Sequence, residues 1–437
     1  MPRISDHCIN KNPSAIRIAQ IKFAERKASG EDIEAINTAI GNVSLPMHPS
    51  MIKRMNALNS HPEFAKGIVK YTSTIGTEET NKSFLNIIAS SGFVVDDLYS
   101  QITEGGSEAM ELALKGTAGL IGGEDRPILL IDAAYTNYNA LASRLGIKTV
   151  SLRRHLKENG KFVLPSLEEI EDLIVKHNPS LLVIIPYDNP TGHFYDHKTL
   201  VALGELAVKH DLWILSDEAY RELHYTDNDV VSVWGLIEEV IPGIINRRIS
   251  IETASKVWNA CGLRIGALIT DNLDLHNRLL AEHTVTLCSN AIGQYIFGAL
   301  ASESHENLNR WYKQQRDYYS NMMIKLTNDF KETLPGVIIS SPDASIYSVV
   351  DVRNIAKPGF NAMDFVLYCA TKGFVESDGV KQTLLVSPMA GFYSVQEGEK
   401  NPGDTQMRIA YVETPEKMAL VPKLFKELFN KYESSRQ

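Results

Sequence analysis

Short apolar runs alternate with segments of helical periodicity between about residues 104 and 270. The runs are rich in Ile, Leu and Val, and they lie at 126–132, 148–152, 180–187, 212–220, 247–253 and 265–270. Between the second and third runs, Leu167, Ile170, Leu173 and Ile174 mark one face of a helix. This alternation is typical of parallel strands that are joined by helical crossovers.

One of these helices has a clear start signal. Ser166 and Glu169 follow Pro165 with the spacing of a capping box, which predicts a helix over residues 165–177. Strands that are apolar on both faces predict a buried parallel sheet, and ligands of such sheets gather outside the carboxyl ends of the strands. We therefore searched for chemistry in the residues that follow each run.

The pattern changes after about Ser302. A long polar helical pattern over residues 302–334 is followed by short strands, and residues 396–406 have the composition of a loop. With 437 residues, the chain is long for a single hydrophobic core. We expect a second, smaller lobe in the C-terminal part.

Composition and charge narrow the class of protein. Hydrophobic residues at 44% and charged residues at 22% are ordinary for a globular protein. A net charge of -9 argues against nucleic-acid binding, which needs concentrated Lys and Arg. The longest apolar run, "LLVIIP", is far shorter than the ~20 residues that a membrane span requires. We expect no nucleic-acid partner and no membrane association.

The cysteines and the N-terminus bear on the compartment. Cys8, Cys261, Cys288 and Cys369 are far apart and form no C-x-x-C pair, so neither a zinc site nor a disulfide framework is indicated. Charged residues and prolines interrupt the first residues before any apolar block that could serve as a signal peptide. We expect free thiols, no metal site and a cytoplasmic location.

Two candidate sites follow the early runs. In "GGSEA" (105–109) a glycine turn opens a helix, and such a turn presents backbone N–H groups to an anion, although it is also an ordinary helix cap. Tyr135 and Tyr138 follow the run at 126–132, where they could offer an aromatic face to a flat ligand or simply belong to the core.

Further candidates follow the later runs. Asn189 lies in the turn sequence "NPTG" and offers an amide donor. Asp217 ends an apolar run in "DEAY", and a carboxylate there is costly unless it has a partner. Lys256 follows another run, where burial would favour a neutral, nucleophilic amine, although a lone lysine is usually a solvated surface residue. Arg264 follows eight residues later, between Gly262 and Gly266, which we expect to allow close approach of the backbone to a ligand.

Taken in order, these motifs resemble one family. "GGSEA", Tyr135, "NPTG", "DEAY", "TASKVWNACGLRIG" and Arg408 in "QMRIAY" are similar to the motifs of the class I and II aminotransferases, which depend on pyridoxal 5′-phosphate (PLP) and have fold type I. The lysine signature in the family's order with the other motifs is highly specific, and the resemblance runs from about Gly41 to Arg408.

The resemblance implies an α/β fold. The large domain would contain a mostly parallel seven-stranded sheet flanked by helices, and the smaller domain would be α+β. The expected division is 1–60 for an N-terminal arm and part of the small domain, 61–305 for the large PLP-binding domain, and 306–437 for the C-terminal small domain.

The resemblance also implies roles for individual residues. Lys256 would bond to the aldehyde carbon of the cofactor, Asp217 would pair with the protonated pyridine nitrogen, and Tyr220 with Asn189 would hydrogen-bond the phenolic oxygen. Tyr135 would stack on the ring. The residues implied to hold the phosphate are Gly106, Ser107, Glu108, Thr253, Ser255, Arg264 and, from a neighbouring subunit, Tyr71. The residues implied to bind the substrate are Gly41, Asn189 and Arg408.

The implied reaction moves the amino group of an L-amino acid to a 2-oxo acid by a ping-pong mechanism through pyridoxamine phosphate. A homodimer with shared active sites would be the active unit. The same residues serve fold type I lyases, such as β-eliminating enzymes, and specialised biosynthetic enzymes, so these remain alternatives. A PLP-dependent transcription regulator would need an N-terminal DNA-binding domain, and only about forty residues with no basic helix precede Gly41.

The substrate side chain is left open. In dicarboxylate-specific aspartate aminotransferases an arginine precedes a Ser-Asn pair by four residues, and Val285 stands at that place before Ser289 and Asn290. An aspartate specificity that uses that arginine is therefore not supported, although another basic residue could serve acidic substrates.

Overall fold

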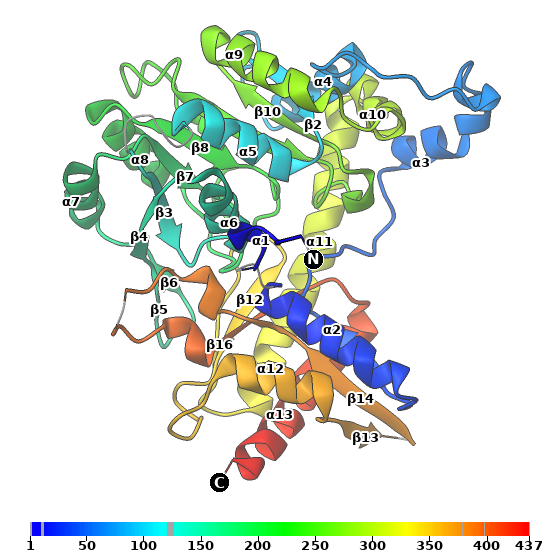
Figure 1. Cartoon of the computed structure of the whole chain (residues 1–437), viewed down its shortest axis with the longest axis vertical. Coiled ribbons are helices and arrows are strands. Elements are labelled where there is room, and N and C mark those ends of the chain that lie inside the picture. The colour runs from blue at the N-terminus through cyan, green and yellow to red at the C-terminus, as the bar shows by residue number, and fades with distance from the viewer. Residues whose placement is uncertain (1, 10–12, 120–125, 378, 397, 437) are drawn as a thin grey trace. The chain divides into compact units, whose positions relative to one another are not determined.

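The chain forms two compact units in a computed structural model that describes residues 2–9, 13–119, 126–377, 379–396 and 398–436 (Figure 1). The large unit consists of Asn42–Asn321 and Ser341–Ile346, and the small unit of Met1–Gly41, Met322–Ser340 and Tyr347–Gln437. The predicted division into domains at residues 60 and 305 stays a prediction.

A seven-stranded sheet forms the centre of the large unit. Its strand order is β2-β10-β9-β8-β7-β3-β4, and only β10 runs antiparallel to its neighbours. The strands are β2 (Tyr99–Thr103), β3 (Ile128–Asp132), β4 (Thr149–Arg153), β7 (Leu181–Ile184), β8 (Trp213–Asp217), β9 (Arg248–Thr253) and β10 (Gly266–Thr270). The predicted α/β fold with a mostly parallel seven-stranded sheet is confirmed.

Each of the six apolar runs contains one of these strands, and β2 is the strand that the runs did not indicate. Its sequence "YSQIT" is largely polar, yet Gln101 and Thr103 are fully buried within the sheet. Because β2 lies at one end of the strand order, it pairs only with β10. Because most of its side chains are polar, β2 contains no apolar run, and the sequence pattern did not indicate this strand.

Helices surround the sheet. Those of the large unit are α3 (Pro49–Asn56), α4 (Glu78–Ser90), α5 (Gly106–Thr117), α6 (Thr136–Leu145), α7 (Leu167–His177), α8 (His197–Lys209), α9 (Leu273–His283) and α10 (Ala291–Phe297). The capping box that predicted α7 is confirmed, since Ser166 Oγ accepts from the N–H of Glu169 at 3.1 Å and Glu169 Oε2 accepts from the N–H of Ser166 at 2.7 Å.

The core of the large unit lies between the sheet and helices α5, α6 and α9 (Figure 1). From the sheet it includes Leu130, Val183, Leu215, Ile251 and Leu268, each nearly or completely buried. Side chains alternate between the two faces of a strand, so the neighbours of these residues point to the opposite face.

The strand directions gather the candidate residues. In a sheet, parallel strands end at the same edge, so Thr103, Asp132, Asp217 and Thr253 share the carboxyl edge. Because β10 is antiparallel to β9, it begins at that edge with Gly266, which pairs with Thr253. The segment that ends with Arg264 therefore reaches the same edge.

The small unit is α+β. It contains a sheet of order β1-β14-β13 and a sheet of order β11-β12-β16-β15. Its strands are β1 (Glu34–Asn37), β11 (Ile338–Ile339), β12 (Tyr347–Asp351), β13 (Val375–Ser377), β14 (Val380–Leu385), β15 (Ser387–Pro388) and β16 (Gln406–Ala410). Its helices are α1 (Asp6–Ile9), α2 (Ala15–Ala28), α12 (Ala362–Thr371) and α13 (Pro415–Ser435). The polar helical pattern is confirmed as α11 (His305–Thr333), which begins in the large unit and ends in the small one.

Short elements complete the chain. A hairpin of β5 (His155–Leu156) and β6 (Phe162–Val163) belongs to the large unit. The 3-10 helices are η1 (Leu58–Ser60), η2 (Phe64–Lys66), η3 (Val233–Gly235), η4 (Cys261–Leu263), η5 (Thr284–Thr286), η6 (Gly298–Ser302), η7 (Ala390–Phe392) and η8 (Pro402–Thr405). Among the described residues, no helix is both long and apolar enough to span a membrane.

Candidate active site

The turn between β2 and α5 is the candidate anion site, and it lies at the carboxyl edge of the sheet. Gly105 has a φ of 73°, and α5 begins at Gly106. The first N–H groups of a helix, here those of Gly106, Ser107 and Glu108, cannot bond within the helix and lie at the positive end of its dipole. The positive φ of Gly105 favours glycine, and a Cβ there would displace the Arg264 guanidinium.

Backbone carbonyls hold Arg264 against this turn. Its Nη1 donates to the carbonyl of Cys261 at 3.1 Å and its Nη2 to the carbonyl of Glu104 at 3.3 Å. Its guanidinium thus adds a full positive charge beside the start of α5, and two of its donors are already oriented.

The two glycines near Arg264 differ. A Cβ on Gly266 would lie 2.6 Å from the carbonyl carbon of Gly105, so this glycine lets β10 approach the turn that begins α5. At Gly262 a Cβ would meet nothing within 4 Å among the described residues. At Gly266 the close approach is thus between two parts of the backbone, and the expected approach of either glycine to a ligand stays a prediction.

Hydroxyl groups lie next to the turn. Thr253, the last residue of β9, donates from Oγ1 to Ser255 Oγ at 2.8 Å and accepts from the N–H of Ser255 at 3.1 Å. A Cβ on Gly106 would lie 3.9 Å from the Cβ of Thr253, so β9 and the start of α5 are in contact here. Exposed Ser107 adds a third hydroxyl in the first turn of α5.

The Glu108 carboxylate is engaged away from its own N–H. It accepts from the N–H of Glu104 at 2.6 Å and pairs with His283 at 3.5 Å. Burial raises the pKa of Glu108, but the hydrogen bonds from His283 and from the Glu104 N–H outweigh it, so the pKa is lowered. Because its carboxylate has these partners, the group of Glu108 that can bind an anion is the backbone N–H.

Asp217 ends β8 at the same edge. Its carboxylate accepts from the N–H of Ala219 at 3.1 Å and from the hydroxyl of Tyr138. Burial raises the pKa of Asp217, whereas Tyr138, the Ala219 N–H and the charge of Lys256 lower it in part. The net shift is upward, so a bound cation would stabilise the charged carboxylate.

Tyr135 caps α6 beside this carboxylate. Its ring packs edge-on against Tyr138 with centroids 5.5 Å apart, and its hydroxyl accepts from Asn137 Nδ2 at 3.0 Å. The sequence suggested only an aromatic face for Tyr138. Its bond to Asp217 joins residues 79 positions apart and leaves no local signal in the sequence.

Asn189 and Tyr220 are brought together. Both are buried, and Asn189 Nδ2 donates to the Tyr220 hydroxyl at 3.4 Å. Arg154, which the sequence did not single out, fixes the turn that carries Asn189. Its Nη1 lies 3.1 Å from Asp188 Oδ2 and donates to Thr191 Oγ1 at 3.3 Å.

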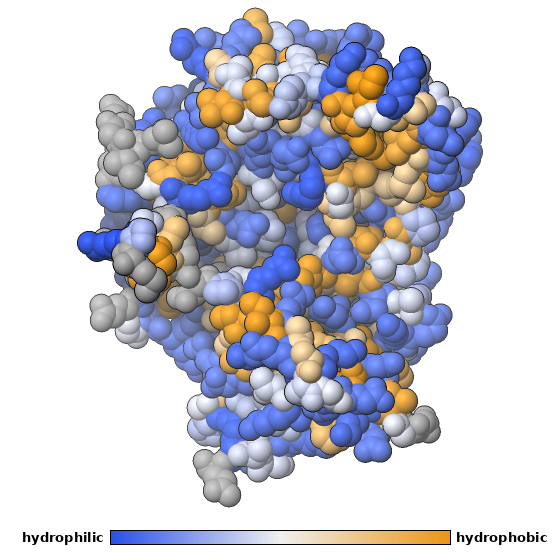
Figure 2. All heavy atoms as spheres, turned by 45° about the vertical axis from the view of Figure 1, so that its right-hand side comes forward, coloured by the Kyte–Doolittle hydropathy of each residue, from blue (hydrophilic) through white to orange (hydrophobic). Residues whose placement is uncertain are grey.

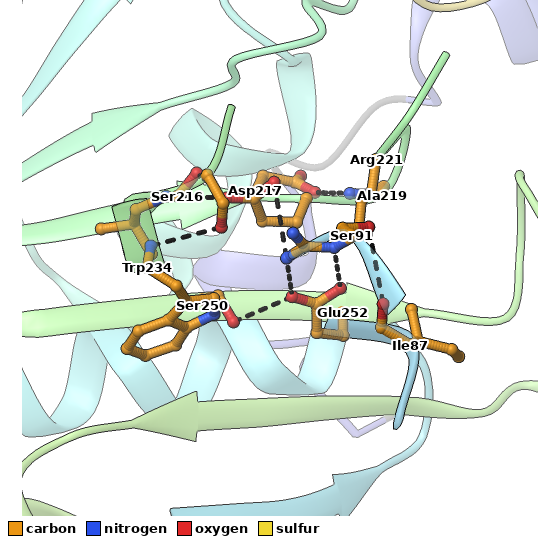
Figure 3. A network of polar contacts seen from close by, with 12 residues as sticks. Ile87, Ser91, Ser216, Asp217, Ala219, Arg221, Trp234, Ser250 and Glu252 are labelled. Carbon is orange, nitrogen blue, oxygen red and sulfur yellow. Dashed lines mark hydrogen bonds and ion pairs between the residues drawn. The ribbon is translucent and has the colours of Figure 1, made fainter. Parts of the chain in front are cut away.

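A buried ionic network lies on the face of β8 and β9 that is opposite Asp217 and Thr253 (Figure 3). Arg221 Nη2 is 2.5 Å from Glu252 Oε1, which also accepts from Ser250 Oγ at 3.0 Å. Glu218 Oε1 accepts from the hydroxyls of Ser216 and Ser232 at 2.8 and 2.9 Å, and its Oε2 lies 3.6 Å from Arg221. The network ties together the ends of the strands that carry Asp217 and Thr253.

Lys256 follows β9 and lies in a turn that its own backbone hydrogen bonds hold together. It is half-buried, and its carbonyl accepts from the N–H of Asn259 at 3.1 Å. Its charge is close enough to Asp217 to lower the pKa of that carboxyl. The large unit thus brings Asp217, Lys256 and the anion site of α5 to one sheet edge.

Three other predicted residues are described within their own units. Arg408 in β16 and Gly41 belong to the small unit and are buried. Arg408 donates to the carbonyl of Ala39 at 2.7 Å, and its guanidinium carbon lies 4.4 Å from the centre of the Tyr347 ring. Tyr71 lies in the large unit with 80% of its surface exposed.

This set of groups fits PLP. The start of α5 suits the phosphate, and the half-buried carboxylate of Asp217 suits a protonated ring nitrogen. The amine of Lys256 follows β9, which lies between β2 and β8 in the strand order of the sheet. Within the described part of the chain, no group of three or more Asp, Glu, His or Cys residues could hold a metal ion.

Comparisons with known proteins identify the family of the chain. The family model of aminotransferase class I and II matches residues 34–393. The chain therefore belongs to this family, and it is a PLP-dependent aminotransferase that moves an amino group between an amino acid and a 2-oxo acid.

Individual relatives are distant. The chain is 25% identical to aspartate aminotransferase from Thermotoga maritima over 353 residues, which cover 79% of this chain and 85% of that protein. A solved structure of a single mutant of Thermus thermophilus aspartate aminotransferase has a TM-score of 0.78 at 20% identity, covering 98% of this chain and 100% of that one. N-Succinyldiaminopimelate aminotransferase from Mycobacterium tuberculosis has a TM-score of 0.77 at 18% identity, covering 96% and 100%. At these identities the structures support the fold alone.

Proposed function

We propose that Lys256, Asp217 and Tyr220 are the catalytic residues of this aminotransferase. One observation carries the proposal: the amine of Lys256, the half-buried carboxylate of Asp217 and the anion site of α5 share one sheet edge in a chain of this family. Bound PLP supplies an electron sink, which stabilises negative charge on the α-carbon of the substrate.

In this proposal, Gly106, Ser107 and Glu108 bind the phosphate through backbone N–H groups. The hydroxyls of Ser107, Thr253 and Ser255 and the guanidinium of Arg264 complete the phosphate site. The geometry around Gly105 and the contact between Thr253 and Gly106 support this assignment.

The residues around the ring have separate tasks. Asp217 holds the proton on the pyridine nitrogen through its charge, and Tyr138 keeps that carboxylate ionised. Tyr220 and Asn189 donate to the phenolic oxygen, and Tyr135 stacks on the ring. The hydrogen bonds Tyr138–Asp217 and Asn189–Tyr220 support these assignments.

Lys256 performs the proton transfers. With PLP held at this site, the Lys256 Nζ would be the base that takes the proton from the α-carbon of the substrate and the acid that gives it to the C4′ carbon of the cofactor. A single positioned base suits this 1,3-shift, because both carbons are presented on one face of a planar system.

Arg408 and Gly41, together with Asn189, are proposed to bind the substrate carboxylate. The ring of Tyr347 and the carbonyl of Ala39 fix the Arg408 guanidinium, which supports a role in bidentate carboxylate recognition. The named relatives include aspartate aminotransferases, but Val285 provides no charge for a second carboxylate. We propose that the enzyme accepts a range of L-amino acids and that it recognises their side chains without an arginine at position 285.

A homodimer is proposed as the active unit. Met55, Ile68, Val69, Tyr71, Val285 and Leu287 are exposed apolar or aromatic residues of the large unit. Gln294 donates to Thr72 Oγ1 at 3.0 Å and to the carbonyl of Ser289 at 2.9 Å, so the segments that flank Tyr71 and Leu287 are side by side. Hydrophobic side chains also gather in the upper part of the face drawn in Figure 2. Such a patch supports an interface between subunits, to which Tyr71 would contribute.

A cytoplasmic location is part of the proposal. The four cysteines are free thiols, which suits a reducing compartment.

The half-reaction tests the proposed chemistry. The yellow holoenzyme is mixed with single L-amino acids in the absence of a 2-oxo acid, and its absorbance is followed. We expect at least one common L-amino acid to convert the cofactor to its amino form, and a 2-oxo acid to restore the original band. Release of pyruvate and ammonia without that conversion, or no response to any amino acid, would contradict the proposal.

A further inference from the structure

The turn that carries Lys256 is closed by its own backbone. The N–H of Asn259 donates to the carbonyl of Lys256 and the N–H of Ala260 to the carbonyl of Ala254, both at 3.1 Å. Asn259 has a φ of 54°, in the left-handed region that asparagine adopts more readily than most residues with a side chain. Contacts from outside the turn add to these two backbone hydrogen bonds.

Helix α11 supplies such contacts from one face. The indole Nε1 of Trp311 donates to the carbonyl of Val257 at 2.9 Å. Four residues later, and thus on the same face of the helix, Gln315 Oε1 accepts from Asn259 Nδ2 at 3.1 Å. Trp311 and Gln315 are 7% and 6% exposed, so both bonds are shielded from water. All four residues belong to the large unit.

Ring packing fixes Trp311 itself. Its ring is nearly parallel to that of Trp258, at 6° and with centroids 6.3 Å apart. His48 packs edge-on against Trp311 at 5.1 Å and against Trp258 at 6.1 Å. Since Trp258 lies in the lysine turn and Trp311 in α11, the rings restrict how far the turn can move against the helix.

We propose that Trp311 is a positioning residue for Lys256. It acts through the Val257 carbonyl, which belongs to the peptide unit between Val257 and Trp258. This bond restrains the backbone one residue after Lys256, and so it limits the directions in which the lysine side chain leaves the turn. The inference rests on the proposed role of Lys256 as the cofactor-bearing residue.

The physical reason is the flexibility of lysine. Its amine ends a stem of four methylene groups, so its position is only as well defined as the backbone from which it starts. A reacting group that is misplaced by 1 Å can lose about 100-fold in rate. Without the indole N–H, the buried Val257 carbonyl would lose this donor, and the turn would relax toward another partner.

A matched pair of variants separates positioning from core packing. Trp311→Phe keeps an aromatic ring and removes the indole N–H. Trp234→Phe is the control, because Trp234 is 4% exposed and its indole N–H is buried without a hydrogen-bond partner. Both variants lose a similar volume from the core of the same unit, but only Trp311→Phe removes a bond to the lysine turn.

Three quantities are measured on the holoenzymes: the pH titration of the absorption band of the lysine-bound cofactor, kcat and KM for one amino acid, and the midpoint of thermal unfolding. For Trp311→Phe we expect a shifted titration midpoint and a kcat lowered by about 10-fold with KM little changed, as for a displaced reacting group. For Trp234→Phe we expect a lower unfolding midpoint with an unchanged titration.

Gln315→Met provides a second variant if Trp311→Phe does not fold. It removes the acceptor for Asn259 Nδ2 and leaves Trp311 in place, and we expect a smaller shift of the same sign. The inference is overturned if whichever of the two variants folds titrates like the wild type. Reduction of the wild-type enzyme with borohydride tests the underlying role of Lys256 separately, because a wild type without a cofactor bond to Lys256 would refute the proposed function rather than the role of Trp311.

Discussion

Tyr138 and the backbone of Ala219 oppose the cost of burying the Asp217 carboxylate. Without them, burial would raise the pKa of Asp217 further, because desolvation is the largest influence on this group. A cation bound beside the carboxylate requires its charged form. The charged form is present above the pKa of Asp217 and is lost as the pH falls through it.

Tyr138→Phe tests this residue. Removing a hydrogen bond to a charged group costs about 1.5–3 kcal/mol. Because the bond from Tyr138 lowers the pKa of Asp217, that pKa is expected to rise further in the variant. We expect the affinity of the apoenzyme for PLP to fall at a higher pH in the variant than in the wild type. The measurement is a series of PLP titrations of the apoenzyme from pH 5 to pH 8.

Tyr411→Phe is the control for this experiment. Tyr411 is fully buried in the small unit, and its hydroxyl is 2.8 Å from Ser348 Oγ. The Tyr411→Phe variant should be less stable than the wild type, but the pH dependence of its PLP binding should be unchanged. Identical pH profiles for Tyr138→Phe and the wild type would show that Tyr138 does not maintain the charge of Asp217.

Sequence reasoning found Asp217 because a carboxylate directly after a buried strand is unusual on its own. It could not find the roles of Tyr138, Arg154 or Trp311. Their partners lie 79, 34 and 54 positions away, and only the folded chain brings them together.

At the scale of elements, the Arg221–Glu252 pair joins β8 to β9 on the face opposite Asp217. Burial raises the pKa of Glu252 to about 7, even though the charge of Arg221 and its hydrogen bond lower it. A carboxyl whose pKa is higher in the folded state than in the unfolded state stabilises the fold fully below its unfolded pKa. That contribution is lost as the pH rises through the folded pKa.

Glu252→Gln removes this titration and keeps an oxygen that can accept from Arg221. We expect the free energy of unfolding of the variant to improve relative to the wild type as the pH rises from 5 to 8, since only the wild type must ionise Glu252. Urea unfolding at both pH values measures the difference. Glu168→Gln, at an exposed carboxylate in the first turn of α7, should show no such trend. A constant difference between Glu252→Gln and the wild type would contradict the assignment.

Elements with a strong local pattern were predicted well. The capping box placed the start of α7, and apolar runs marked six of the seven strands. Strand β2 was missed because its pairing with β10, rather than apolar side chains, defines it. The ionic network was missed because Arg221 pairs with Glu252, which lies 31 positions further along the chain on the neighbouring strand β9.

At the scale of the whole molecule, Tyr71 distinguishes an active site that is formed by one chain from an active site that is shared between two subunits. It is 80% exposed in a single chain, although its motif implies a contact with the phosphate. If the phosphate contact comes from a neighbouring subunit, two inactive variants should complement each other.

Lys256→Ala and Tyr71→Ala subunits provide this test. After they are unfolded together and refolded as an equal mixture, about half of the dimers are hybrids with one intact site in two, so activity should recover to about a quarter of the wild-type value. Each variant refolded alone serves as the control. A mixture no more active than the sum of its components would place Tyr71 outside the partner's site.

The most direct test of the account is the identity of the lysine that carries the cofactor. The holoenzyme is reduced with borohydride, digested with a protease and mapped by mass spectrometry. The account predicts that the pyridoxyl phosphate group lies on Lys256, and that Lys256→Ala removes both the label and the yellow colour. A label on another lysine, or a yellow wild-type enzyme that yields an unlabelled Lys256 peptide, would contradict it.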